Sequence, residues 1–211
     1  IPPVKCIYSG FDPSDFGAPQ PAAEAGVVVY GGTFYSGRSP IELVQAYHDF
    51  LFELGPGTPA PLHFKFFAKF EQAGEETTFR ALIKELCVER HFSLFPLVSR
   101  EQFFQELRKA QFSLVITHSE GSEYAIPGKI FDYLSANSSL LVLTSDKALL
   151  DFLGEFKIRA HVMPNNRLGI HQGLRQIANE NVYEGHVLTD SAAELSCINQ
   201  GRKMAEYLFQ S

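Results

Sequence analysis

Lys129 and Asp132 are the two side chains of this sequence whose types and spacing best suit a charged ligand. They lie three residues apart in the stretch Ala125–Leu134, so in a helix they would share one side with Tyr133. Pro127 suits the first turn of such a helix, because an N–H group there would have no partner. A lysine and an acid on a helix that follows a strand could bind a phosphate and a hydroxylated group together. An exposed ion pair that binds nothing explains the same spacing.

The stretch Gly31–Arg38 is a second candidate site, because it follows the apolar run 27–30 and precedes a helical pattern. Gly32 would let the backbone come close to a ligand, and Arg38 would offer a forked cation to a phosphate. The stretch has neither the GxGxxG spacing of dinucleotide-binding proteins nor the Gly-Lys-Ser/Thr ending of a P-loop. A solvated surface arginine remains the alternative interpretation of Arg38.

Two further loops follow predicted strands. The segment Pro96–Ser99, with Val98 at its centre, could clamp a flat base between apolar side chains. The segment 119–124 carries Glu120 and Glu123, which could bind sugar hydroxyls. A plain strand-to-helix connection and a solvated loop are the respective alternatives. His118 is the one histidine that we expect near this edge of the sheet.

Composition excludes several classes of function. The chain has 211 residues, of which 45% are hydrophobic, and a formal net charge of −6, so nucleic acid is not an expected partner. The three cysteines form no CxxC pair, the histidines form no HxxxH pair, and we expect neither a metal site nor a disulfide. No apolar run is long enough to span a membrane, and no signal peptide is recognisable. We expect a cytoplasmic location. Because the sequence begins Ile-Pro-Pro without methionine, we also expect that it is a piece of a longer protein.

Apolar runs and helical patterns alternate along the chain, which predicts a parallel sheet covered by helices on both faces. We expect strands at 27–30, 62–67, 92–95, 112–117, 140–144 and 159–163, and a short one at 4–8. We expect helices at 40–54, 76–89, 99–109, 127–134, 147–153, 167–179 and 189–209. Capping boxes are predicted at Ser39 and Ser99, and an N-cap at Asp146. The prediction is a single Rossmann-like three-layer α/β/α domain with about six strands and a long C-terminal helix, in which Cys87 and Cys197 are core thiols.

Taken together, these motifs resemble the C-terminal, donor-binding domain of a GT-B fold glycosyltransferase of the retaining family-four type. Residues 6–12 look like the family's segment that leads into this domain, with Ser9 in place of its usual asparagine. Residues 29–40 look like its loop between a strand and a helix, and residues 126–134 resemble its "Pro-x-Lys-x-x-Glu-Tyr-Leu" helix. The resemblance covers nearly the whole chain and implies that residues 1–211 are the donor-binding domain, with an N-terminal acceptor domain outside this chain.

The resemblance also implies roles for individual residues. Arg38 and Lys129 would be catalytic, since they would stabilise the departing diphosphate. Asp132 would bind the ribose hydroxyls. Thr33 stands where the family carries an arginine, and Tyr124 stands where it carries its first acid. The implied donor-binding residues are Gly32, Thr33, Val98, Glu123, Tyr124, Ile126, Pro127, Gly128 and Asp132.

The implied activity is transfer of a glycosyl group from a nucleoside diphosphate sugar to a glycan or lipid-linked acceptor, with no metal or other cofactor. This would place the protein in polysaccharide biosynthesis, with peripheral membrane association of the full-length form. Two alternatives remain open. The first is a non-catalytic nucleotide-sugar-binding relative, which Thr33 and Tyr124 favour because they replace the family's arginine and acid. The second is a sugar-nucleotide epimerase of similar architecture.

Overall fold

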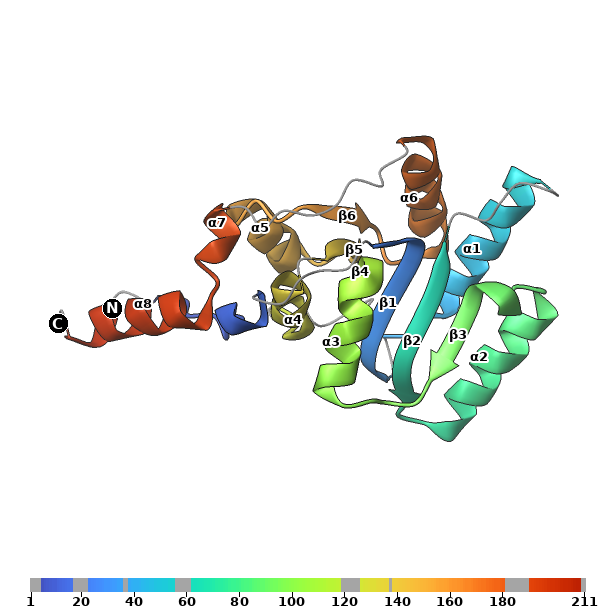
Figure 1. Cartoon of the computed structure of the whole chain (residues 1–211). Helices are drawn as coiled ribbons and strands as arrows, with labels where there is room; N and C mark the ends of the chain where they lie inside the picture. Colours follow the sequence, from blue (N-terminus) through green and yellow to red (C-terminus); the bar gives the residue numbers. More distant parts are fainter. Residues whose placement is uncertain are drawn as a thin grey trace.

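Six parallel strands form one sheet between two layers of helices (Figure 1). The computed structural model describes residues 5–16, 23–35, 38–55, 62–118, 126–136, 138–180 and 190–209. The strand order is β3-β2-β1-β4-β5-β6, so the predicted Rossmann-like α/β class is confirmed. The strands are β1 (Glu24–Phe34), β2 (His63–Phe70), β3 (Phe92–Phe95), β4 (Ala110–Ile116), β5 (Ser139–Leu143) and β6 (Ala160–Met163).

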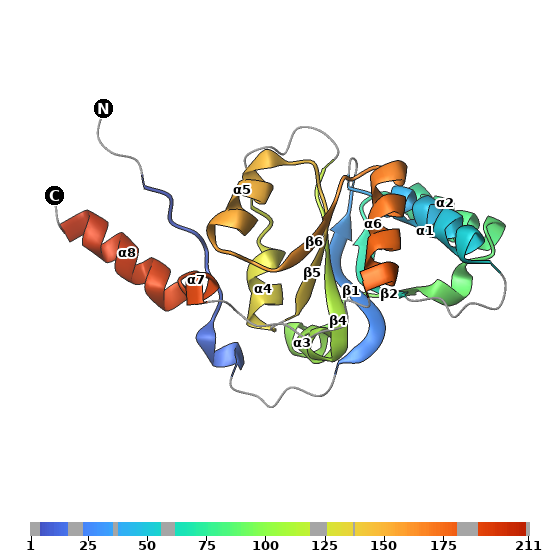
Figure 2. The ribbon, with the colours of Figure 1, turned by 90° about the horizontal axis from the view of Figure 1, so that it is seen from above.

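The helices cover both faces of the sheet, as the continuous apolar strands require. Figure 2 shows α3, α4 and α5 on one side and α1, α2 and α6 on the other. Their bounds are α1 (Ile41–Leu54), α2 (Ala73–Glu85), α3 (Arg100–Lys109), α4 (Lys129–Ser135), α5 (Lys147–Glu155) and α6 (Arg167–Glu180). The chain builds outward from β1 to β3 and then returns to the other side of β1 as β4. The strand order therefore reverses between β1 and β4, which is where such sheets bind their ligands.

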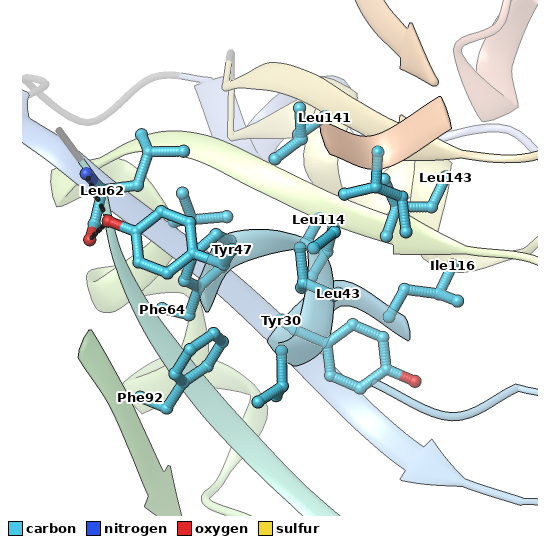
Figure 3. Close-up of a cluster of buried hydrophobic side chains, with 14 of the residues drawn as sticks. Tyr30, Leu43, Tyr47, Leu62, Phe64, Phe92, Leu114, Ile116, Leu141 and Leu143 are labelled. Carbon is cyan, nitrogen blue, oxygen red and sulfur yellow. Dashed lines mark hydrogen bonds between the residues drawn. The ribbon is translucent and has the colours of Figure 1, made fainter. Parts of the chain in front are cut away.

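An aromatic-rich core lies under α1, α2 and α6 (Figure 3). Tyr47 of α1 is fully buried there, and its hydroxyl donates to the Leu62 carbonyl at 2.6 Å and accepts from the Leu62 N–H at 3.2 Å. The Phe64 and Phe92 rings of the neighbouring strands stack with centroids 4.9 Å apart. The Tyr47 bonds hold α1 at the start of β2, and the ring stack joins β2 to the edge strand β3, so this part of the sheet is held by side chains as well as by backbone pairing.

β1 is longer than the sequence predicts, because it continues through Gly31 and Gly32 to Phe34. The two glycines pair with Phe67 and Ala68 of β2 and do not leave the sheet as a loop. The register with β4, in contrast, runs only as far as Val29, opposite Ser113. Beyond Val29, one edge of β1 is therefore open on the side of β4.

Two of the three predicted helix caps are confirmed. The Ser99 hydroxyl accepts from the Gln102 N–H and the Gln102 side chain accepts from the Ser99 N–H, as a capping box requires, and Asp146 caps α5. The prediction of a capping box at Ser39 is wrong. Pro40 occupies the N-cap position of α1 with no side-chain cap, and the Glu42 carboxylate instead accepts the Arg167 N–H at 2.9 Å. A tertiary partner has thus replaced the local one.

The predicted terminal helix is not continuous. It is divided into α7 (Asp190–Ala193) and α8 (Cys197–Phe209), with Phe11 bound at the break. The Phe11 N–H donates to the Leu195 carbonyl at 3.0 Å, and the Cys197 N–H donates to the Phe11 carbonyl at 2.8 Å. Residues 5–10 form no strand, so the short strand predicted at 4–8 is wrong over that part. Cys87 and Cys197 are exposed, and their prediction as core thiols is wrong as well.

Candidate functional site

The Lys129 side chain enters the open edge of β1. Lys129 is the first residue of α4, and its Nζ donates to the Gly31 carbonyl at 3.0 Å and lies 3.8 Å from the centroid of the Tyr30 ring. No described acidic side chain pairs with it. Burial, together with the nearby charge of Arg38, lowers the pKa of Lys129 to about 7. The alternative interpretation, an exposed Lys129–Asp132 ion pair, is therefore wrong, because Lys129 bonds to the Gly31 carbonyl and Asp132 pairs with Arg100.

Side chains of α4 replace the strand that β1 lacks beyond Val29. The Gly31 N–H donates to the hydroxyl of the fully buried Tyr133 at 3.3 Å, while the Gly31 carbonyl accepts from Lys129. A Cβ atom on Gly31 would overlap the Phe103 ring of α3, so any other residue at this position requires that ring to move. Gly32 has a φ of +130°, which side chains rarely adopt, and a Cβ there would lie 3.3 Å from Lys129 Nζ. The backbone of Gly31 and Gly32 is thus in close contact with the Lys129 ammonium.

Asp132 faces a different cation from the one that the sequence predicts. Its Oδ1 accepts from the Arg100 guanidinium at 3.4 Å, and Arg100 also donates to Asp15 Oδ2 at 2.8 Å. The Asp132 side chain is 46% exposed, so its carboxylate is accessible to a ligand. Lys129 lies three residues away, on the inner side of the same helix turn.

A cavity of about 310 Å³ connects these groups. The predicted residues Gly32, Val98, Lys129 and Asp132 all line it, so the structure brings them together from β1, the β3–α3 loop and α4. Its other lining residues are Gly31, Phe67, Leu97, Arg100 and Phe103. The cavity therefore has a basic end at Lys129, an acid at Asp132 and an apolar wall beside Val98.

Arg38 and Thr33 are not among the residues that line this cavity. The Arg38 guanidinium lies 4.8 Å from the centroid of the Tyr35 ring, and its buried Nε has no hydrogen-bond partner among the described residues. The Arg38 charge is near enough to lower the pKa of both Lys129 and His118, after burial, which is the larger cause in each case. Arg38 thus lies near the Lys129 end of the cavity, and its Nε–H is available to a ligand.

The remaining predicted residues fall into two groups. Glu123 and Tyr124, like Glu120, lie outside the described residues. Ile126, Pro127 and Gly128 lead into α4, where the Pro127 carbonyl accepts the Ile130 N–H at 3.0 Å. The helix begins at Lys129, two residues later than the proline-led start that the sequence predicts.

Sequence reasoning missed four residues of the site: Phe67, Arg100, Phe103 and the hydroxyl of Tyr133. Arg100 directly follows the Ser99 cap, so its position at the start of a helix after a predicted strand was a usable signal. No comparable signal marks Phe103 or Tyr133, since an aromatic residue in a helix normally indicates core packing.

Neither a metal cluster nor a membrane span is found in the described part of the chain. No group of three or more histidine, cysteine, aspartate or glutamate side chains in residues 5–209, outside the undescribed segments, could hold a metal ion. None of the described helices is long and apolar enough to cross a membrane.

Solved structures of glycosyltransferases share this fold. The chain is similar to HepE of Anabaena in complex with UDP-glucose, with 10% identity and a TM-score of 0.69 over 98% of this chain and 57% of that one. It is also similar to the C-terminal domain of a group 1 glycosyl transferase, LpcC, of Francisella tularensis, with 9% identity and a TM-score of 0.62 over 87% and 95% of the two chains. A UDP-forming α,α-trehalose-phosphate synthase of Burkholderia xenovorans aligns with 10% identity and a TM-score of 0.60 over 86% and 43%.

At these identities the likeness establishes the fold. The chain spans 57% of the length of HepE but covers nearly all of the isolated LpcC domain. It therefore shares the fold of that isolated C-terminal domain, which agrees with the fold that the resemblance implies. No family model matches the sequence, and no curated protein matches it either.

Proposed function

We propose that this chain is the donor-binding domain of a glycosyltransferase and binds a nucleoside diphosphate sugar at the cavity between β1, α3 and α4. In this proposal Lys129 and Arg38 bind the diphosphate and stabilise the charge that develops on it as the sugar departs. Asp132 accepts hydrogen bonds from the ribose, and the base packs beside Val98. The structural neighbours that contain UDP or UDP-glucose support this choice of ligand.

The observation that carries the proposal is the buried ammonium of Lys129, which no described acid neutralises. Burying a charge without a partner is costly, and here the cost is evident in a pKa lowered to about 7. A second cation, Arg38, lies close enough to add to that cost and carries an unpaired buried Nε. A diphosphate at this position would neutralise the charge of Lys129 and accept a hydrogen bond from Arg38 Nε, because it brings negative charge and acceptor oxygens to both cations.

The shape of the cavity suits the rest of a nucleotide. Asp132 lies on the rim with an accessible carboxylate, and carboxylates accept hydrogen bonds from vicinal hydroxyls. Phe67, Leu97 and Val98 provide the apolar surface on which a planar base can pack. The position of the cavity at the reversal of strand order agrees with where such sheets bind ligands.

The properties of the whole protein follow as part of the same proposal. An N-terminal acceptor-binding domain would supply a glycan or a lipid-linked acceptor, in polysaccharide biosynthesis. The full-length protein would work in the cytoplasm, at the inner face of the membrane, without a metal. The described domain alone would bind donor but transfer no sugar.

A second candidate function is nucleotide-sugar binding without catalysis. The location of Arg38 outside the cavity lining favours it, because only one of the two predicted cations faces the ligand space. Donor turnover by the full-length protein separates the two functions, since a non-catalytic relative would bind donor and release no nucleotide.

Calorimetric titration of the purified chain with UDP and with GDP tests the proposal directly. We expect saturable binding of one of the two, weakened at least about tenfold by Lys129→Gln and by Asp132→Asn, since each removes a charged hydrogen-bonding group. Lys147→Gln is the matched control, because Lys147 is an exposed lysine of α5 paired with Asp151. Absence of binding to both nucleotides, or equal affinity in all variants, would refute the proposed site.

A further inference from the structure

The Arg100 guanidinium lies between two carboxylates at the rim of the cavity. Its Nη2 donates to Asp15 Oδ2 at 2.8 Å and to Asp132 Oδ1 at 3.4 Å, and its Nη1 donates to Asp15 Oδ1 at 3.5 Å. The Phe104 ring supports the guanidinium from one face, with Cζ 4.3 Å from the ring centroid. Arg100 is thus held in place by contacts from three elements and is joined to the acid that faces the ligand.

Asp15 belongs to the N-terminal segment and is itself fixed. The Arg108 side chain donates to the Asp15 carbonyl at 2.7 Å, and the Asp15 N–H donates to the Asp12 carbonyl at 3.1 Å. The Asp15 side chain is only 18% exposed, and the two Asp15–Arg100 hydrogen bonds have the paired geometry that orients a planar guanidinium. Asp15 therefore sets the direction from which Arg100 approaches Asp132.

An ordinary surface ion pair would need none of this arrangement. Arg100 is 61% exposed, so its pairing with Asp132 adds little to stability. Its effect on Asp132 is a different matter, because a carboxylate held at one oxygen cannot rotate freely and keeps the other oxygen for a ligand. A cis-diol offers two O–H donors to such a carboxylate, whereas a 2′-deoxyribose offers one.

We propose that Asp15 and Arg100 are positioning residues that orient Asp132 toward the 2′,3′-diol of a ribose, so that the domain selects ribonucleotides over 2′-deoxyribonucleotides. This inference rests on the proposed function, and it adds a selection step and the residues responsible for it. It also gives the N-terminal segment a part in ligand recognition, through a chain of contacts from Asp15 to Arg100 to Asp132.

The test compares each nucleoside diphosphate with its 2′-deoxy form by calorimetry, using UDP with dUDP and GDP with dGDP. For the wild type we expect the ribose form to bind about tenfold more tightly, as one lost hydrogen bond to a charged group implies. In Arg100→Gln and in Asp15→Asn this ratio should fall by at least about threefold, because the ribose form should lose more affinity than the deoxy form does. Arg175→Gln is the matched control, because Arg175 is a similarly exposed arginine paired with Glu53 on the opposite face of the sheet.

A double-mutant cycle with Asp132→Asn tests whether Arg100 acts through Asp132. We expect Arg100→Gln to have no further effect on the ratio once Asp132 is replaced. An unchanged ratio in Arg100→Gln, or an equal loss of affinity for both sugar forms, would overturn the inference and leave the proposed function standing. If the wild type bound no nucleotide at all, the proposed function itself would fail, and this inference with it.

Discussion

Replacing Lys129 with methionine should make the domain more stable at acid and neutral pH, although it removes a residue that we place in the site. Methionine fills a similar volume without a charge, and no described acid loses a partner. The ordinary pKa of the lysine is 10.5, and burial lowers it to about 7 in the folded chain. The unfolded state therefore binds the proton more tightly, and the stability of the wild type should rise with pH between these two values.

The expected magnitude follows from the same two values. The pKa difference corresponds to a destabilisation of about 5 kcal/mol near pH 6 and about 2 kcal/mol near pH 9. The wild type should accordingly gain about 3 kcal/mol through this group between these pH values, whereas Lys129→Met should gain nothing through it. Urea denaturation of both proteins at about pH 6, 7.5 and 9 measures this difference.

Lys147→Met is the control for the general effect of removing a lysine. Lys147 is 85% exposed, so its replacement should leave the pH dependence of stability unchanged. The reasoning would be refuted if Lys129→Met were less stable than the wild type near pH 6, or if both proteins gained stability equally with pH. Either result would mean that the contacts of Lys129 with Gly31 and Tyr30 compensate fully for its burial.

Three further changes test how the site is supported. Gly31→Ala should lose about 1–3 kcal/mol of unfolding free energy, because its Cβ would overlap the Phe103 ring. Gly154→Ala is the control and should lose none through packing, because a Cβ atom on Gly154 would meet no other atom; equal urea midpoints for the two variants would contradict this reasoning. Ser99→Ala should lose about 1 kcal/mol by the same assay, and an unchanged midpoint would mean that the capping box of α3 contributes nothing. Gln200→Ala should speed hydrogen exchange at the Tyr8 N–H, because this N–H donates to Gln200 Oε1 at 2.9 Å. Unchanged protection of that amide would mean that the hydrogen bond does not hold the N-terminal segment.

The order of strands and helices could be predicted because the evidence for it is local. Continuous apolar runs indicate strands buried on both faces, and the Ser99 and Asp146 caps are set by residues only two or three positions away. The errors occur where a distant residue decides. The Ser39 cap is replaced by a contact of Glu42 with the N–H of Arg167, and the terminal helix is divided where Phe11 binds.

The site could be predicted in part for the same reason. Lys129, Asp132, Gly32 and Val98 lie near or beyond the carboxyl ends of strands that meet at one edge, so their convergence follows from the topology. The partners of these residues do not follow from it. That Lys129 turns inward to Gly31 depends on how far the β1–β4 pairing extends, and that Asp132 meets Arg100 depends on how α3 packs beside α4.

The bridge between Phe11 and Ser196 has a mechanical consequence. The two segments run parallel, so a stretching force applied to the two ends of the chain would pull them in opposite directions along their length. Both hydrogen bonds that hold Phe11 would then be loaded in shear at the same time, ahead of any bond in the sheet. Once this bridge broke, the load would pass along the N-terminal segment to Asp15 and its bonds with Arg100. Tension on the chain ends would therefore reach the rim of the cavity before it reached the core.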